Sequence, residues 1–158
     1  IIRQKTATLI AACCEIGVLS NGADAALAKK MQDFGTYTGM AFQIKDDLFD
    51  YMSSNVIGKP VGIDIKEQKM TLPLIHALDT SNTEDRKHYF DIIKRHNTDQ
   101  KQVKRLIEFV KTSGGLDYAV QIMKNFQEKA RLILMEFPEI PARRSLELML
   151  DYVIERKF

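Results

Sequence analysis

Apolar residues recur every three or four positions along almost the whole chain, and no stretch bounded by turn residues alternates apolar and polar side chains. The first spacing places apolar side chains on one face of an α-helix, whereas a half-buried strand requires alternation. The sequence therefore predicts an all-α fold. Because 158 residues is the usual size of one domain, we expect residues 1–158 to form a single all-helical domain.

Clusters of Gly, Pro, Asn and Ser divide this pattern into separate helices. The segment from Ser53 to Gly62 includes Gly58-Lys59-Pro60, which cannot continue a helix, and is expected to be the principal loop. Thr83 is the expected N-cap of the helix that begins beside it. The predicted helices cover about Ile2–Gly17, Ala23–Tyr51, Thr71–Leu78, Glu84–His96, Asp99–Ser113, Leu116–Glu136 and Pro141–Lys157.

Small residues, among them Ala11, Cys13 and Cys14, dominate the first predicted helix. This composition predicts burial on nearly all sides, with close neighbours. In the second predicted helix Gly35 and Gly39 share one face, although each glycine lowers helix stability by about 1 kcal/mol relative to alanine. We therefore expect another backbone or a ligand to approach the helix there.

The charge and cysteine content exclude several classes of protein. Lys and Arg number 23 and Asp and Glu 21, so the net charge of +2 does not favour a nucleic-acid partner. Cys13 and Cys14 are adjacent and could close a disulfide only with strain, which favours reduced thiols in a reducing compartment. The apolar stretch Ala7–Cys14 is far shorter than the roughly 20 residues that cross a bilayer. We expect a cytoplasmic protein without a membrane span.

Three aspartates, Asp46, Asp47 and Asp50, lie in a predicted helix that is otherwise apolar, and Gln43 lies one turn earlier. Converging carboxylates repel one another unless a cation neutralises them. Oxygen ligands without His or Cys favour a hard cation, and Mg²⁺ commonly binds one or two carboxylates together with substrate phosphates. An exposed acidic face is the alternative, but the apolar neighbours favour a Mg²⁺ site that takes a phosphorylated ligand.

A glycine-rich segment with two lysines follows the aspartates. It runs from Gly58 and Lys59 to Gly62, and Lys69 comes seven positions later. Glycine allows the backbone to approach an anion, and lysine ammonium groups suit diphosphate oxygens. Either lysine alone would be explained by solvent exposure, but together with the aspartates they predict a diphosphate site.

The order of these segments resembles the all-trans polyprenyl diphosphate synthase family, the group of farnesyl, geranylgeranyl and octaprenyl diphosphate synthases. Its second aspartate-rich motif, FQxxDDxxD, is followed by GKxxGxD and KxTLP segments, and all three occur here between Phe42 and Pro73. A Lys-Thr pair on an earlier helix of the family corresponds to Lys5-Thr6. The resemblance implies the isoprenoid-synthase helical bundle, with this chain as its C-terminal part.

The resemblance also implies a reaction. A prenyltransferase of this family condenses isopentenyl diphosphate with an allylic diphosphate to make a longer all-trans polyprenyl diphosphate. The implied cofactor is Mg²⁺, which Asp46 would bind directly while Asp47 and Asp50 would hold its water ligands. The intact protein would be a homodimer.

Five other residues acquire roles from the same resemblance. Lys5 and Lys59 would contact the allylic diphosphate, with Lys69 nearby. The backbone carbonyl of Thr6 and the side chain of Gln43 would face the carbocation that forms as the allylic substrate ionises. Cations and hydrogen-bond donors around the leaving diphosphate would stabilise the charge that develops in the transition state.

The sequence also departs from the family pattern. It lacks the first aspartate-rich motif, the Arg pair after it and the basic isopentenyl diphosphate site, and it begins Ile1-Ile2 without an initiator Met. We expect a C-terminal half of a prenyltransferase that is inactive by itself. Such a half would expose the apolar face that packs on the remainder, which favours association.

Two alternatives stay open. The chain could be a noncatalytic helical subunit or partner in a heteromeric prenyltransferase, although the retained motif residues argue against that interpretation. It could also be a terpene cyclase of the same fold, but the pairing of FQxxDDxxD with GKxxGxD favours chain elongation.

Overall fold

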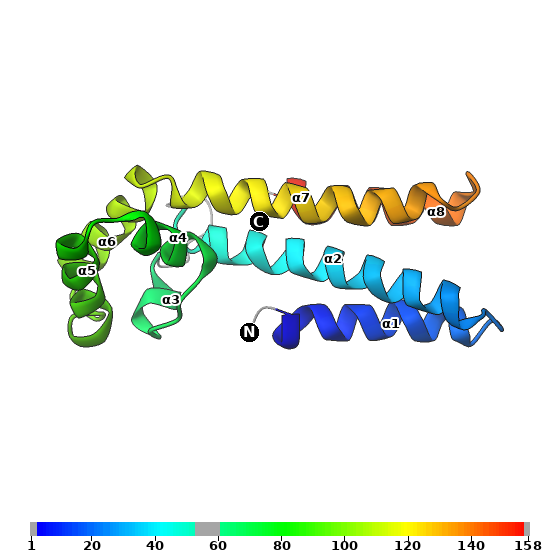
Figure 1. Cartoon of the computed structure of the whole chain (residues 1–158), viewed down its shortest axis with the longest axis horizontal. Helices are drawn as coiled ribbons and strands as arrows, with labels where there is room; N and C mark the ends of the chain where they lie inside the picture. The colour runs from blue at the N-terminus through cyan, green and yellow to red at the C-terminus, as the bar shows by residue number, and fades with distance from the viewer. Residues whose placement is uncertain (1–2, 53–60, 157–158) are drawn as a thin grey trace. The chain divides into compact units, whose positions relative to one another are not determined.

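The computed structural model describes residues 3–52 and 61–156, and every regular element in these ranges is a helix (Figure 1). This confirms the predicted all-α class. None of the described helices is long and apolar enough to cross a membrane. The elements are η1 (Arg3–Ala7), α1 (Thr8–Leu19), α2 (Ala25–Phe49), α3 (Ile63–Lys66), α4 (Leu72–Thr80), α5 (Thr83–Arg95), α6 (Gln100–Thr112), α7 (Gly115–Met135) and α8 (Pro141–Glu155).

The observed helices differ from the predicted ones in three places. The first helix opens with the π-helical turn η1 and only then becomes the α-helix α1. The short helix α3 was not predicted, because four residues carry no periodic pattern. The N-cap of α5 is Asn82 and not Thr83: the side-chain oxygen of Asn82 accepts from the backbone N–H groups of Glu84 (3.0 Å) and Asp85 (2.9 Å).

The chain divides into two compact units. One comprises Ile1–Lys45 and Ile122–Phe158, and the other comprises Asp46–Gln121. Each unit has an apolar core of its own. That the whole chain forms a single domain stays a prediction.

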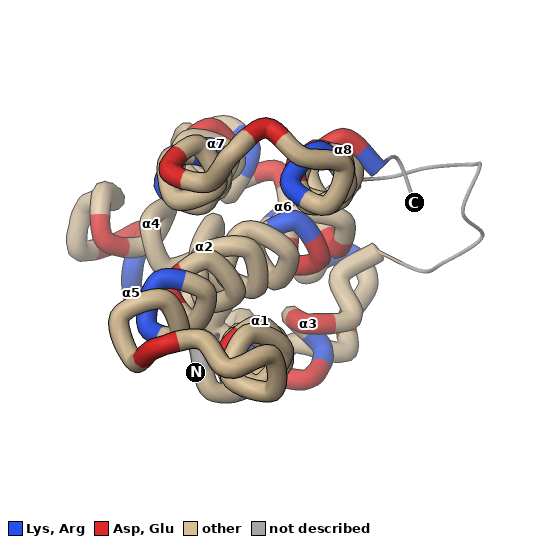
Figure 2. The backbone as a smooth tube through the Cα atoms, turned by 90° about the vertical axis from the view of Figure 1, so that its right-hand side faces the viewer, with Lys and Arg blue, Asp and Glu red and all other residues tan. Residues whose placement is uncertain are grey.

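In the first unit, α1, α2, α7 and α8 lie side by side, and Figure 2 views these helices end on. Their core contains Met31 and Phe34 from α2, Ala130 and Leu134 from α7, and Leu150 from α8. Helices far apart in the sequence are therefore held together by buried apolar side chains, which is the main stabilising contribution in such a bundle.

Helices α1 and α2 pack at very short range through glycine. A Cβ atom on Gly35 would lie 2.7 Å from the Cα atom of Ala11, and one on Gly39 would lie 2.5 Å from the Cα atom of Ala7. No real Cβ atom tolerates these distances, so both positions require glycine. The predicted close approach at Gly35 and Gly39 is confirmed, and the approaching group is a backbone.

The prediction that the first helix is buried on nearly all sides is wrong. Ala11 is buried, but Leu9 and Ile16 on the outer face are 70% and 63% exposed, and Cys13 is exposed as well. Small residues on the inner face serve the close packing against α2, whereas the described residues leave the outer face open. That this face packs on the remainder of a longer protein stays a prediction.

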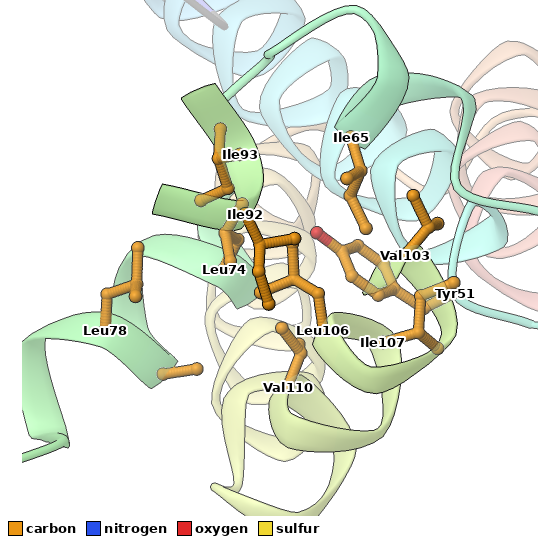
Figure 3. Packing of buried hydrophobic residues seen from close by; sticks show 11 residues of the cluster. Tyr51, Ile65, Leu74, Leu78, Ile92, Ile93, Val103, Leu106, Ile107 and Val110 are labelled. Carbon is orange, nitrogen blue, oxygen red and sulfur yellow. The ribbon is translucent and has the colours of Figure 1, made fainter. Parts of the chain in front are cut away.

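The second unit packs α3, α4, α5 and α6 around another core (Figure 3). Its largest buried side chain is Tyr51, which follows α2 by two residues. The α6 helix presents apolar residues at the spacing of one helix face, and these meet side chains of α4 and α5. The cluster comprises Tyr51, Ile65, Leu74, Ala77, Leu78, Ile92, Ile93, Val103, Leu106, Ile107 and Val110.

Candidate functional site

Helix α2 carries most of the predicted site residues near its C-terminal end. Gln43 and Asp47 are buried, with 6% and 7% of their surface exposed, and Asp46 is half-buried. The helix ends at Phe49, so Asp50 lies one residue beyond it, in the turn that leads to Tyr51. Buried polar side chains at the end of an apolar helix are costly unless they have partners.

The partner of Gln43 within the first unit is Thr6. The Thr6 hydroxyl donates a hydrogen bond of 2.8 Å to Oε1 of Gln43, across 37 positions of sequence. Thr6 belongs to the π-helical turn η1, and such turns occur often at functional sites. The structure therefore brings together two residues that the sequence assigned to one site. The side chain of Lys5, the residue before Thr6, lies outside the described part.

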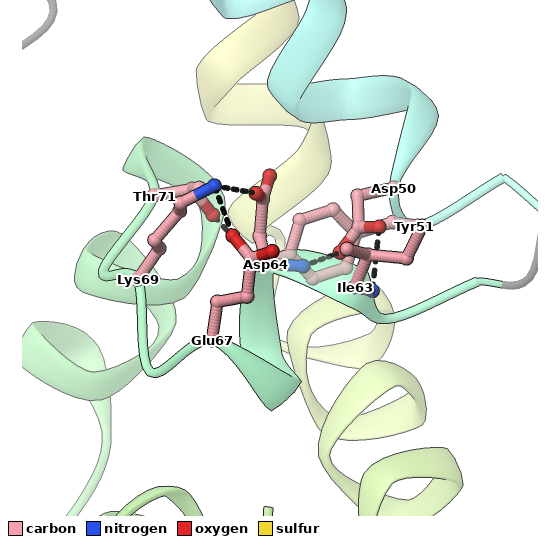
Figure 4. Close-up of polar contacts among 7 residues, drawn as sticks. All are labelled: Asp50, Tyr51, Ile63, Asp64, Glu67, Lys69 and Thr71. Atoms are coloured by element: carbon pink, nitrogen blue, oxygen red, sulfur yellow. Dashed lines mark hydrogen bonds and ion pairs between the residues drawn. The ribbon is translucent and has the colours of Figure 1, made fainter.

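Asp50 organises the start of α3 in the second unit. Its carboxylate oxygens accept hydrogen bonds from the backbone N–H groups of Ile63 (2.8 Å) and Asp64 (3.0 Å), the first residues of α3, as Figure 4 shows. Its carbonyl accepts from the N–H of Gly62 (3.0 Å), which has a φ of +78°. Burial raises the pKa of the Asp50 carboxyl, the negative charge of Asp64 adds to this rise, and the backbone N–H donors oppose it.

Lys69 is also linked to Asp64. Its ammonium lies 3.2 Å from a carboxylate oxygen of Asp64 and forms a second ion pair with Glu67 (Figure 4). Hydrogen bonds to these two carboxylates raise the pKa of Lys69 above its usual value. Asp64 therefore links Asp50 and Lys69. Its backbone N–H donates to Asp50, and its carboxylate pairs with Lys69.

Three residues at this place were not predicted as part of a site. Asp64 ends the GKxxGxD motif, so the motif itself could have marked it. Tyr51 and Thr71 share a buried hydrogen bond of 2.8 Å between their hydroxyl groups, and burial raises the pKa of Tyr51. Thr71 belongs to the KxTLP segment, but no sequence signal indicated its contact with Tyr51, because the two positions are 20 apart.

The turn between α3 and α4 is tied to the connection between α5 and α6. The side-chain amide of Asn97 donates a hydrogen bond of 2.6 Å to the carbonyl of Lys66, the last residue of α3. Gln68, in the same turn, has a φ of +56°, a backbone conformation that non-glycine residues seldom adopt. These two features fix the path of the chain into Lys69.

Comparison with known proteins decides the family. A family model described as polyprenyl synthetase matches residues 1–110. The chain belongs to the polyprenyl synthetase family.

Curated relatives match nearly all of the chain. It is 35% identical over 158 residues to the heptaprenyl diphosphate synthase component 2 of Bacillus subtilis, covering 99% of this chain and 44% of that protein. It is 36% identical over 157 residues to the short chain isoprenyl diphosphate synthase of Methanothermobacter thermautotrophicus, covering 99% of this chain and 48% of that one. The chain thus spans about half the length of the relatives it matches.

Solved structures confirm the fold of the chain. The geranylgeranyl pyrophosphate synthase from Bacteroides thetaiotaomicron superposes with a TM-score of 0.90 at 38% identity, over 98% of this chain and 51% of that one. The decaprenyl diphosphate synthase from Rhodobacter capsulatus gives 0.89 at 32% identity, over 98% and 48%. The predicted isoprenoid-synthase helical fold is therefore confirmed.

The residues of this chain that could hold a metal ion are carboxylates. Within the described residues, no group of three His, Cys, Asp or Glu side chains is arranged to hold a metal ion. Asp46 and Asp47 supply only oxygen ligands, and Mg²⁺ typically takes one or two carboxylates and completes its shell with water and substrate phosphates. This donor set fits a Mg²⁺ ion shared with a diphosphate. Lys59 lies outside the described residues.

Proposed function

We propose that the chain supplies the second aspartate-rich half of an all-trans polyprenyl diphosphate synthase, which condenses isopentenyl diphosphate with an allylic diphosphate. Family membership and relatives named as isoprenyl and polyprenyl diphosphate synthases support this proposal. As in the family, the intact protein would act as a homodimer. Product chain length is left open, because the family sets it mostly before the first aspartate-rich motif.

The observation that carries the proposal is the contact between Thr6 and Gln43. A hydroxyl held at 2.8 Å from a buried amide oxygen fixes the Gln43 side chain on the helix that also carries Asp46. A fixed amide can face a developing carbocation without reorganising, which is how preorganised dipoles lower a barrier. The backbone carbonyl of Thr6 would share this role.

The charged residues would serve the diphosphate. Asp46 would hold Mg²⁺, and the carboxylates of Asp47 and Asp50 would help to balance the positive charge of the ion. The metal would in turn neutralise the negative charge of the diphosphate leaving group. Lys69, held by Asp64, would bind diphosphate oxygens. Lys5, from η1, and Lys59 would do the same.

The chemistry then follows three stages. The bond between the allylic carbon and the diphosphate oxygen breaks, and the cations around that oxygen stabilise the charge it gains. A new carbon–carbon bond forms with isopentenyl diphosphate, and the proton lost from the condensed product goes to the departing diphosphate. Because it lacks the first aspartate-rich motif, the chain alone is expected not to convert substrate.

A second candidate is a helical partner in a heteromeric synthase. The observation that favours it is the name of the Bacillus subtilis relative, which describes one component of a heptaprenyl diphosphate synthase. Such a partner would bind its companion chain but would not require Asp46 for activity.

A prenyl transfer assay tests both candidates. The chain is incubated with isopentenyl diphosphate, an allylic diphosphate and Mg²⁺, beside the same chain extended upstream to its next in-frame start and an Asp46→Ala variant of the extended chain. We expect activity only in the extended chain and its loss with Asp46→Ala. Full activity of Asp46→Ala would remove Asp46 from the site, and no activity in either chain would favour the noncatalytic partner.

A further inference from the structure

The last described residue of the chain, Arg156, packs against α2 beside Gln43. Its guanidinium carbon lies 4.1 Å from the centroid of the Phe42 ring, and its Nη2 group donates a long hydrogen bond of 3.5 Å to the carbonyl of Phe42. Both side chains are half-buried. A guanidinium over an aromatic face is attracted by the ring quadrupole, and more strongly where water is partly excluded. Arg156 therefore contacts both the ring and the backbone of a residue 114 positions away.

Helix α8 presents Arg156 from a fixed position. The helix ends at Glu155, and the backbone N–H of Arg156 still donates to the carbonyl of Tyr152 at 3.0 Å. In the last turns of α8, the Asp151 carboxylate accepts a hydrogen bond of 3.0 Å from the side chain of Gln127 on α7. The backbone from which the Arg156 side chain extends is thus held by contacts of α8 itself.

Contacts from the two ends of the described chain meet on consecutive residues of α2. Thr6 of η1 fixes the side chain of Gln43, and Arg156 stacks on Phe42. These four residues belong to the first unit. In an α-helix the carbonyl of residue 42 also accepts from the N–H of residue 46, so Arg156 meets the turn that leads from Gln43 to Asp46. Thr6 orients the amide, and Arg156 contacts the turn from which that amide projects.

Another cation over an aromatic ring of α2 lacks this relation to Gln43. Lys129 of α7 lies 5.7 Å from the centroid of the Tyr37 ring and 5.7 Å from that of Phe126. The Lys129 side chain is exposed, and Tyr37 precedes Gln43 by six positions. Lys129 is therefore a matched control for Arg156, because it is also a cation over a ring of α2.

We propose that Arg156 is a positioning residue: its guanidinium, stacked on the Phe42 ring, holds the turn of α2 from which the Gln43 side chain projects. Arg156 acts through Phe42 and needs no contact of its own with substrate or metal. What the positioned amide does rests on the proposed function, which assigns Gln43 to the developing carbocation. The hold on the turn does not rest on it.

Amide hydrogen exchange in the 158-residue chain tests this hold. We expect Arg156→Gln to lower the protection of the backbone amides of Gln43 and Asp46 by about fivefold to tenfold, because the turn loses a stacking contact. Amides of α7 should keep their protection, and Lys129→Gln, which removes the same charge, should leave the turn unchanged. Arg156→Lys should restore part of the protection, since an ammonium keeps the charge but not the planar stack.

A double-mutant cycle shows whether Arg156 acts through the ring. Phe42→Leu keeps an apolar side chain and removes the aromatic face. In that background Arg156→Gln should cause little further loss of protection at Gln43. Independent, additive losses from the two substitutions would contradict action through Phe42.

Kinetics of the extended chain test what the positioned amide does. Loss of an interaction made only in the transition state lowers kcat and kcat/KM together and leaves KM unchanged. We expect Arg156→Gln to lower kcat by about fivefold to tenfold with the KM for the allylic diphosphate unchanged, and Lys129→Gln to retain full kcat. Absence of turnover in the unmutated extended chain would contradict the proposed function, and hydrogen exchange would then decide the role of Arg156.

Three further outcomes would overturn the proposal. Equal protection of Gln43 in Arg156→Gln and Lys129→Gln would show that Arg156 does not hold the turn. An equal loss of protection throughout α2, α7 and α8 would show general destabilisation without a local role. A raised KM at unchanged kcat would show that Arg156 binds substrate directly and does not act by positioning.

Discussion

The Thr6 hydroxyl donates to Oε1 of Gln43 at 2.8 Å and thereby joins the first turn of the described chain to helix α2. Gln43 is buried, so its amide has no access to bulk water as a substitute partner. The contact therefore contributes to stability and to the orientation of a side chain that we place in the reaction site.

Replacing Thr6 with valine keeps the shape of the side chain and removes its donor. We expect Thr6→Val to lower the free energy of unfolding by about 1–2 kcal/mol, because a buried acceptor loses a partner. Urea titration followed by circular dichroism measures this change. Thr36→Val is the matched control, since its hydroxyl binds only the backbone carbonyl of Gln32 one turn earlier. Equal stability losses in the two variants would contradict the role of the Thr6 contact.

Replacing glycine with alanine should have opposite effects on stability at Gly39 of α2 and at Gly17 of α1. Gly39→Ala places a methyl group 2.5 Å from the Cα atom of Ala7, and we expect overpacking to destabilise the protein by about 1–3 kcal/mol. Gly17→Ala in α1 meets nothing within 4 Å, so alanine should stabilise by about 0.5–1 kcal/mol through helix propensity. Thermal unfolding compares the two variants, and a stabilising Gly39→Ala would refute the close packing.

Sequence patterns predicted this part of the fold well because the constraints are local. Glycines four apart on an apolar helix indicate a close neighbour whatever that neighbour is. They do not identify it, since the contact with η1 and α1 depends on residues more than twenty positions away. The exposed outer face of α1 escaped prediction for the same reason, because burial depends on what packs against a helix and not on its composition.

Substitutions at Asn82 and Thr83 can show which of these adjacent residues caps the start of α5. Asn82→Ala should cost about 1 kcal/mol of stability, because its side chain accepts from two backbone N–H groups at the start of the helix. Thr83→Ala should change stability by less than about 0.5 kcal/mol, since Thr83 is already within the helix. Urea titrations of both variants decide between them, and the reverse order of effects would restore Thr83 as the cap.

Within the candidate site, the sequence grouped Asp46, Asp47 and Asp50 as one acidic set. Their spacing on a helix justified that grouping, but α2 ends before Asp50, and both Asp50 oxygens accept from the backbone of α3. This second role could not be read from the sequence, because it depends on how the chain returns thirteen residues later. Asp64, the residue that links Asp50 to Lys69, went unassigned although it ends the GKxxGxD motif.

Substitutions can distinguish the metal-binding role proposed for Asp46 from the structural role of Asp50. Asp46→Ala should weaken Mg²⁺-dependent binding of inorganic diphosphate by at least about tenfold and should leave stability nearly unchanged, because it removes one of several mutually repelling carboxylates. Asp50→Ala should instead reduce amide hydrogen-exchange protection at Ile63 and Asp64, since it removes their acceptor. Asp33→Ala is the matched control on α2, because Asp33 is only partly buried and its ion pair is with Lys29. Loss of protection in Asp46→Ala as large as in Asp50→Ala would show that both aspartates act as structural residues and would remove Asp46 from the proposed metal site.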